Sequence, residues 1–197
     1  DQLGRVRSSV TPDRGTWVNT YDGRGNLLTA TQGCLRLKNT YDGLGRRTRE
    51  EPVVVSGCVY KSSEFPPART WTYDEVRAAY NKGRLTSSSD GSGTRTSNYN
   101  AAGELQSTSR TISPRDTALP VKSYSFAYEY DTGGRLSKTT FPDGDVITRT
   151  YDAAGLLSSV SGVASSISYD AAGRFTSMTH ANGVTSLDWV SYPILKF

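Results

Sequence analysis

The sequence has few of the residues on which many enzymes and metal sites depend. Its 197 residues include one His, two Cys and one Met, and no apolar run is long enough to span a membrane. A single His excludes metal sites built from several imidazoles, and a Ser-His-Asp triad could use only His180. Two cysteines are also too few for a disulfide scaffold or a structural zinc site.

Charge and hydropathy further limit the class of protein. The formal net charge is +4, but the basic residues are spread along the chain and no block of five like charges occurs. This pattern favours a mildly basic surface over a nucleic-acid partner. The mean hydropathy of −0.52 is low enough for a disordered chain. However, 12 Tyr, 5 Phe and 3 Trp are atypical of disorder, and abundant Thr, Tyr and Gly are typical of strands and turns.

A short motif, Tyr-Asp-x-x-Gly, recurs along the chain. Intact copies begin at Tyr21, Tyr41, Tyr130, Tyr151 and Tyr169, a variant begins at Tyr99, a stretched form runs from Tyr73 to Gly83, and the chain opens with Asp1–Gly4, which lacks only the Tyr. The intervals from Tyr21 to Tyr41, from Tyr130 to Tyr151 and from Tyr151 to Tyr169 are 20, 21 and 18 residues. Such regular self-similarity predicts a repeat array.

Each motif has the chemistry of a hairpin turn. The Asp carboxylate can accept hydrogen bonds from the N–H groups that follow it, and the Gly can adopt the left-handed conformation of a three-residue loop with a bulge. The Asp then faces the residue after the Gly, which gives the pairs Asp1–Arg5, Asp42–Arg46, Asp131–Arg135 and Asp170–Arg174. The Tyr faces the next residue, which gives Tyr21–Leu27, Tyr99–Leu105, Tyr130–Leu136, Tyr151–Leu157 and Tyr169–Phe175, with Tyr41–Arg47 as the exception.

The segments between the turns are typical of strands. Residues 123–130 alternate strictly and place four aromatic residues on one face. Turns at the opposite strand ends are predicted at Thr11–Asp13, Phe141–Gly144 and His180–Gly183. The expected fold is therefore all-β: antiparallel hairpins forming a twisted, curved, open sheet. Asp74–Tyr80 is the one candidate for a turn of helix.

The motif, its spacing and the Pro-Asp-Gly turn together resemble the Rhs/YD-repeat family. The resemblance extends from Asp1 to about Ser186, so that residues 1–186 form the repeat segment and residues 187–197 a non-repeat tail. Departures from the family pattern are Asn100 in place of Asp, the irregular stretch from Glu50 to Arg69, and Asn26, Glu104 and Leu156 at the position of the Arg.

This resemblance implies a segment of a hollow β-shell in a bacterial protein that is secreted or attached to the cell surface. The implied partners are a C-terminal toxin or effector polypeptide, or further repeats of the same protein. The missing first Tyr and the non-repeat tail indicate a piece of a longer array, whose open sheet edges favour self-association. The self-cleaving element of toxin-releasing members contains Asp-Pro. This dipeptide does not occur in the sequence, so we expect no autoproteolysis.

No residue is assigned a catalytic, cofactor-binding or metal-binding role, and no cofactor is expected. His180 lies in a turn sequence without convergent partners, and one Asp per repeat opposite an Arg is the wrong electrostatics for calcium. Cys34 and Cys58 could form a disulfide across neighbouring strands, but two free thiols are favoured while the compartment is unknown. An alternative function is carbohydrate binding on Trp17, Trp71 and Trp189, although packing between strands is favoured for these rings.

Overall fold

The computed structural model describes residues 1–13, 15–59, 65–114 and 119–185, with the backbone alone for 184 and 185. Every regular element in this part of the chain is a β-strand, which confirms the all-β prediction. No described segment forms a helix that could cross a membrane.

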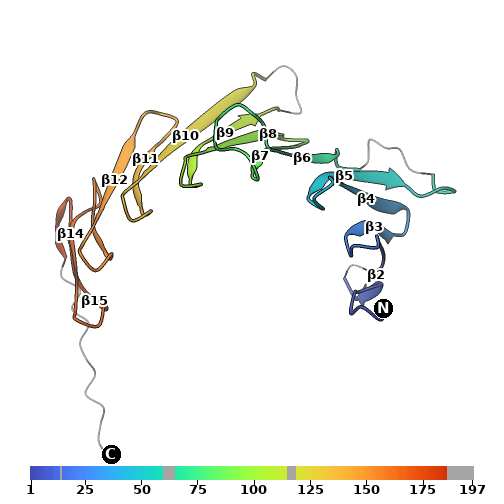
Figure 1. Cartoon of the computed structure of the whole chain (residues 1–197), viewed down its shortest axis with the longest axis horizontal. Coiled ribbons are helices and arrows are strands. Elements are labelled where there is room, and N and C mark those ends of the chain that lie inside the picture. The colour runs from blue at the N-terminus through green and yellow to red at the C-terminus, as the bar shows by residue number, and fades with distance from the viewer. Residues whose placement is uncertain (14, 60–64, 115–118, 186–197) are drawn as a thin grey trace, which may run out of the picture. The chain divides into compact units, whose positions relative to one another are not determined.

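The strands are short, between three and nine residues. In chain order they are β1 (Ser8–Thr11), β2 (Gly15–Tyr21), β3 (Leu27–Gln32), β4 (Leu35–Tyr41), β5 (Arg47–Val54), β6 (Arg69–Tyr73), β7 (Leu85–Asp90), β8 (Gly93–Tyr99), β9 (Leu105–Ile112), β10 (Lys122–Tyr130), β11 (Leu136–Thr140), β12 (Val146–Tyr151), β13 (Leu157–Val160), β14 (Ala164–Tyr169), β15 (Phe175–His180) and β16 (Gly183–Thr185) (Figure 1).

Strand order follows sequence order, from β1 to β16, and the sheet is open. The chain divides into two compact units, one of residues 1–103 and 108–124, the other of residues 104–107 and those from 125 onward. Within each unit, consecutive strands pair antiparallel. The predicted array of hairpins is therefore confirmed.

The turn at Tyr41 shows how the repeated motif builds a hairpin. The Gly45 N–H donates to the Asp42 carbonyl at 3.0 Å, and the Asp42 N–H donates to the Arg46 carbonyl at 2.9 Å. The Asp42 carboxylate accepts the N–H groups of Leu44 and Arg46, each at 2.9 Å. Gly45 has φ +80°, which an L side chain resists, and a bulge places Tyr41 opposite Arg47.

The same register recurs in the other repeats. Tyr faces its predicted partner in the pairs Tyr21–Leu27, Tyr130–Leu136, Tyr151–Leu157 and Tyr169–Phe175, and the stretched repeat places Tyr73 opposite Leu85. Ion pairs join Asp1–Arg5, Asp42–Arg46, Asp131–Arg135 and Asp170–Arg174, as the motif predicts. The pair Tyr99–Leu105 stays a prediction.

The two faces of the sheet differ in character. The face that carries the motif tyrosines, here the Tyr face, holds the less exposed residues; in β10, Phe126 and Tyr128 are half-buried whereas Ala127 and Glu129 are exposed. The other face, here the Ser/Thr face, carries cross-strand hydroxyl pairs such as Thr20–Thr29 and Thr70–Ser89. Among the described residues, only Ala164 and Ile167 are buried apolar residues, as expected of a sheet without a covering layer.

The stretched repeat contradicts one expectation. Asp74–Tyr80 forms turns and not a turn of helix. Polar side chains fold this insert onto its neighbouring strands: Asn81, which is 1% exposed, donates to the Glu75 carbonyl and accepts the Tyr99 N–H. The Arg77 guanidinium donates to the Thr86 carbonyl. These side-chain contacts with backbone replace the hydrogen-bond ladder of a helix.

The expected end of the array lies close to the end of the described region. The last strand, β16, ends at Thr185. The predicted boundary at residue 186 and the tail of residues 187–197 lie outside the described residues and stay predictions.

Candidate functional site

The motif tyrosines link each repeat to the one before it. Each hydroxyl donates a hydrogen bond, 2.8–3.1 Å long, to a backbone carbonyl on the preceding hairpin. The bonds are Tyr21 to Val6, Tyr41 to Leu27, Tyr73 to Arg47, Tyr99 to Leu85, Tyr130 to Leu105, Tyr151 to Leu136 and Tyr169 to Leu157. Sequence reasoning paired each Tyr within its own hairpin and missed this second contact.

The Arg that follows the turn Gly reaches forward in the opposite direction. Arg46 pairs with Asp42 at 2.7 Å, contacts Asp74 at 2.5 Å and lies 4.3 Å from the ring centre of Tyr73 in the next repeat. The hydrogen bonds that Arg46 donates to the Asp74 and Asp42 carboxylates raise its pKa, and the guanidinium is charged at any working pH. The same stacking joins Arg5 to Tyr21 at 5.0 Å, Arg84 to Tyr99 at 5.1 Å and Arg135 to Tyr151 at 4.6 Å.

The two cysteines form a disulfide, with their Cα atoms 5.7 Å apart. The expectation of two free thiols is therefore wrong. The register of β4 on β5 explains the pairing: Leu35 faces Val54, and the Val55 N–H donates to the Cys34 carbonyl at 2.9 Å, so both thiols arrive at the same strand end. The two cysteines are 24 positions apart in the sequence, and the bond closes the loop between them.

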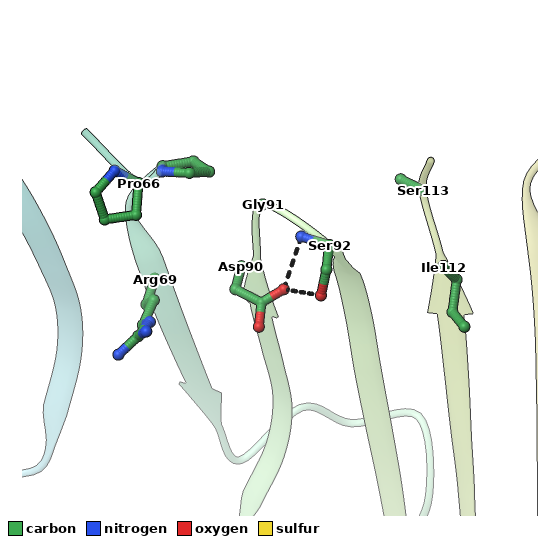
Figure 2. A pocket seen from close by; sticks show the side chains of 8 residues that line it. Pro66, Arg69, Asp90, Gly91, Ser92, Ile112 and Ser113 are labelled. Carbon is green, nitrogen blue, oxygen red and sulfur yellow. Dashed lines mark hydrogen bonds between the residues drawn. The ribbon is translucent and has the colours of Figure 1, made fainter. Parts of the chain in front are cut away.

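A cavity of about 390 Å³ lies at the turn between β7 and β8, and Figure 2 shows its lining. The Asp90 carboxylate accepts the Ser92 N–H at 2.9 Å and the Ser92 hydroxyl at 2.6 Å, and Arg110 donates to the same hydroxyl. The Ser92 hydrogen bonds and the Arg110 charge lower the pKa of Asp90. No imidazole lines the cavity, so Ser92 has no base of the kind that activates a serine nucleophile.

The one histidine that the sequence offers lies at a turn. His180 ends β15 and pairs with Gly183 across the turn, as its position in the sequence predicts. Within the described ranges, no three His, Cys, Asp or Glu side chains gather as they would around a metal ion. The absence of catalytic, cofactor and metal residues stays a prediction.

The tryptophans offer limited surface for a sugar ring. One face of Trp71 is covered by the Arg47 guanidinium, 4.1 Å from the ring, and Trp17 is half-buried in β2. Trp189 lies outside the described residues. Carbohydrate binding stays a prediction.

A family comparison identifies the repeat. Residues 130–167 and 151–185 match the model described as RHS Repeat. Residues 130–185 are therefore Rhs repeats. The tyrosine hydrogen bonds found in this Rhs segment recur from Tyr21 onward, so the same unit is built throughout the described chain. The resemblance to the Rhs/YD-repeat family is confirmed.

Solved structures share this Rhs fold over most of the chain. The crystal structure of TcdB2-TccC3-Cdc42 matches with a TM-score of 0.73 and 18% identity over 92% of this chain, and that of TcdB2-TccC3 with 0.74 and 17% over 92%. The Photorhabdus luminescens Tc holotoxin pore with a mutant TccC3 matches with 0.75 and 17% over 91%. This chain spans 10% of the length of each of these chains. No curated protein matches it.

Proposed function

We propose that this chain is a structural segment of a β-shell that encloses a polypeptide passenger, such as a toxin or effector, and performs no catalysis itself. The observation that carries the proposal is the match of 92% of the chain to the TcdB2-TccC3 fold. The repeat-to-repeat contacts support it, because hydrogen bonds from each Tyr and stacking by the Arg residues make a sheet that can be extended without a second layer.

The partners and the cell compartment follow from this proposal. Further Rhs repeats of the same protein would continue the sheet, and residues 1–186 would be its repeat segment, followed by a separate tail. The Cys34–Cys58 disulfide favours an oxidising environment, which supports secretion or a place on the cell surface. We propose a bacterial source on the matches to the Tc toxin structures.

Enclosure is tested by protection from proteolysis. The longest natural polypeptide that contains this sequence is purified and treated with a nonspecific protease, with and without a concentration of denaturant that opens the sheet. We expect the passenger segment to survive only while the shell is intact. Equal digestion under both conditions would refute enclosure, and the mass of the protected fragment identifies the passenger.

The sheet edges of the isolated chain give a second test. Among the described strands, β1 and β16 each have one neighbour, and an unpaired edge can add a strand from another molecule. We propose that the isolated chain self-associates through these edges. Light scattering after size exclusion measures the mass; a monodisperse monomer that unfolds cooperatively would contradict this proposal.

A further inference from the structure

Three repeats lack the forward-reaching Arg, and in one of them a cavity lies in its place. In the repeat that begins at Tyr21, the residue after the turn Gly is Asn26. The Asn26 amide donates to the Asp22 carboxylate at 2.9 Å. It therefore makes the contact with the motif Asp that the Arg makes in other repeats. The side chain is too short to cover the ring of Tyr41 in the next repeat, as Arg46 covers Tyr73.

The cavity beside Tyr41, here the Tyr41 cavity, has a volume of about 590 Å³. Its lining includes Asp22, Asn26, Asn39, Tyr41 and Asp42, together with the cations Arg24 and Lys38. In the part of the chain that the structure describes, no Arg or Lys stacks on the Tyr41 ring. In four other repeats a guanidinium lies on this face of the ring. On Tyr41 the same face is open to a ligand.

A buried acceptor in the Tyr41 cavity has no donor. Asn39 is 4% exposed, and its Oδ1 makes no hydrogen bond within the described residues. The equivalent side chain one repeat earlier, Asn19, donates to the Val6 carbonyl at 3.0 Å. A buried carbonyl oxygen without a partner is destabilising, so the site calls for a ligand that brings N–H groups.

The Tyr41 cavity also contains the Asp22 carboxylate, and the backbone carbonyl of Asp22 accepts a hydrogen bond of 3.2 Å from the Arg5 guanidinium. Asp22 forms no ion pair in the described ranges, whereas the four Asp residues followed by Arg after the turn Gly all do. The Asn26 hydrogen bond lowers the pKa of Asp22, so the carboxylate is ionised at neutral pH. Burial raises the pKa of Tyr41; the Arg47 charge lowers it, and the Asp22 charge makes a smaller contribution that raises it, so both charges act on this ring.

Two cations at the rim limit the affinity. The Arg24 guanidinium is directed along the turn edge, where it donates to the Gly43 carbonyl at 3.1 Å. Lys38 leaves β4 on the Ser/Thr face, next to Asn39, and it also lines the cavity. Both reduce the attraction for a cation, and we expect dissociation constants of about 1 mM for a single group.

We propose that the Tyr41 cavity binds a guanidinium group supplied by another polypeptide, as an Arg side chain that lies against the Tyr face. The ring face, the Asp22 carboxylate and the Asn39 Oδ1 match the flat cation and its several N–H donors. The site goes beyond the proposed function, because any polypeptide that meets this face could use it.

The test is a titration of the isotope-labelled full chain with N-acetyl-arginine amide, followed by nuclear magnetic resonance. We expect saturable shifts at the Asn39 side-chain amide and the Tyr41 ring. The uncharged isostere N-acetyl-citrulline amide should bind at least about tenfold more weakly, because it lacks the cation. Equal binding of the two probes, or no saturable shift with either, would overturn the proposal.

Two variants test whether the arginine probe binds in the Tyr41 cavity. Asn26→Arg supplies the guanidinium from within the chain, so it should abolish binding of the arginine probe and raise the unfolding midpoint. Leu156→Arg makes the same change at another repeat and should leave the titration unchanged. Undiminished binding to a folded Asn26→Arg variant would place the probe elsewhere. If that variant does not fold, the comparison of arginine and citrulline probes on the natural chain decides.

Discussion

The Tyr41 hydroxyl donates a hydrogen bond of 2.8 Å to the backbone carbonyl of Leu27, the residue that faces Tyr21 across the preceding hairpin. Tyr41 therefore acts in two repeats: its backbone closes its own hairpin opposite Arg47, and its side chain holds the hairpin before it. Because the residue and the contact recur together, the repeat specifies both the turn and the attachment of one turn to the next.

Removing one such hydroxyl should weaken the sheet. Tyr130→Phe deletes the 3.0 Å hydrogen bond to the Leu105 carbonyl and leaves the ring in place. We expect a loss of about 1 kcal/mol in the free energy of unfolding, measured by urea denaturation. Tyr128→Phe is the matched control on the same strand and face, since its hydroxyl makes no hydrogen bond in the described ranges. Equal losses in both variants would argue against the tyrosine link.

Substitution of two turn glycines distinguishes the cost of backbone strain from the contribution of Arg–Tyr stacking. Gly25 and Gly103 have similar φ values, +89° and +85°, and an added Cβ would meet no atom within 4 Å at Gly25 but would overlap the Arg84 guanidinium at Gly103. Both Gly→Ala changes should cost about 1–2 kcal/mol for the left-handed backbone. Gly103→Ala should lose a further ~0.5–1 kcal/mol, because Arg84 must leave the Tyr99 ring. Thermal or urea unfolding measures the difference, and equal losses would contradict the stacking contribution.

The turn carboxylates should make stability depend on acid pH. Hydrogen bonds from the Arg46 backbone and guanidinium lower the pKa of Asp42 below its ordinary 3.8. A carboxyl with a lowered pKa stabilises the fold above about pH 4 and loses this contribution as the pH falls through its folded-state value. We expect Asp42→Asn to be less stable at pH 7 and to show a smaller drop in unfolding midpoint between pH 5 and pH 2.5. An unchanged pH profile would show that the ion pair with Arg46 adds nothing.

The disulfide should contribute more than any single turn contact. Reduction, or the double change Cys34→Ser with Cys58→Ser, should lower the free energy of unfolding by about 3 kcal/mol for a loop of this length. Titration of the natural chain under denaturing conditions should find no free thiol. Dithiothreitol should lower the unfolding midpoint of the natural chain but not that of the double variant. Two titratable thiols in protein purified without reductant would contradict the bond.

The turn and strand register could be derived from single motifs, because their chemistry is local. Asp42, Gly45 and Arg46 lie within one loop, and a bulged hairpin leaves one arrangement for the Asp carboxylate, the left-handed Gly and the facing Arg. The faces of β10 followed in the same way from strict alternation, since side chains of a strand point to opposite sides in turn.

Contacts between repeats were harder to derive, since they depend on how one hairpin lies on the next. Nothing in the Tyr41 motif indicates that its hydroxyl reaches Leu27, 14 residues earlier. The signal that could have revealed the forward stacking is the recurrence of Arg after the turn Gly, together with its replacement by Asn26. The insert after Tyr73 misled the helix prediction because Asn81 and Arg77 bond to backbone carbonyls of neighbouring segments, a tertiary effect without a sequence period.

Among the described strands, each pairs with its neighbours in sequence order, and this has an evolutionary consequence. Because the tyrosine and arginine contacts also join adjacent repeats, a hairpin duplicated or deleted in frame would meet the same chemistry on both sides. Recombination within such a gene could lengthen or shorten the array one unit at a time, so that the number of repeats is free to drift while the contacts between neighbouring repeats stay the same.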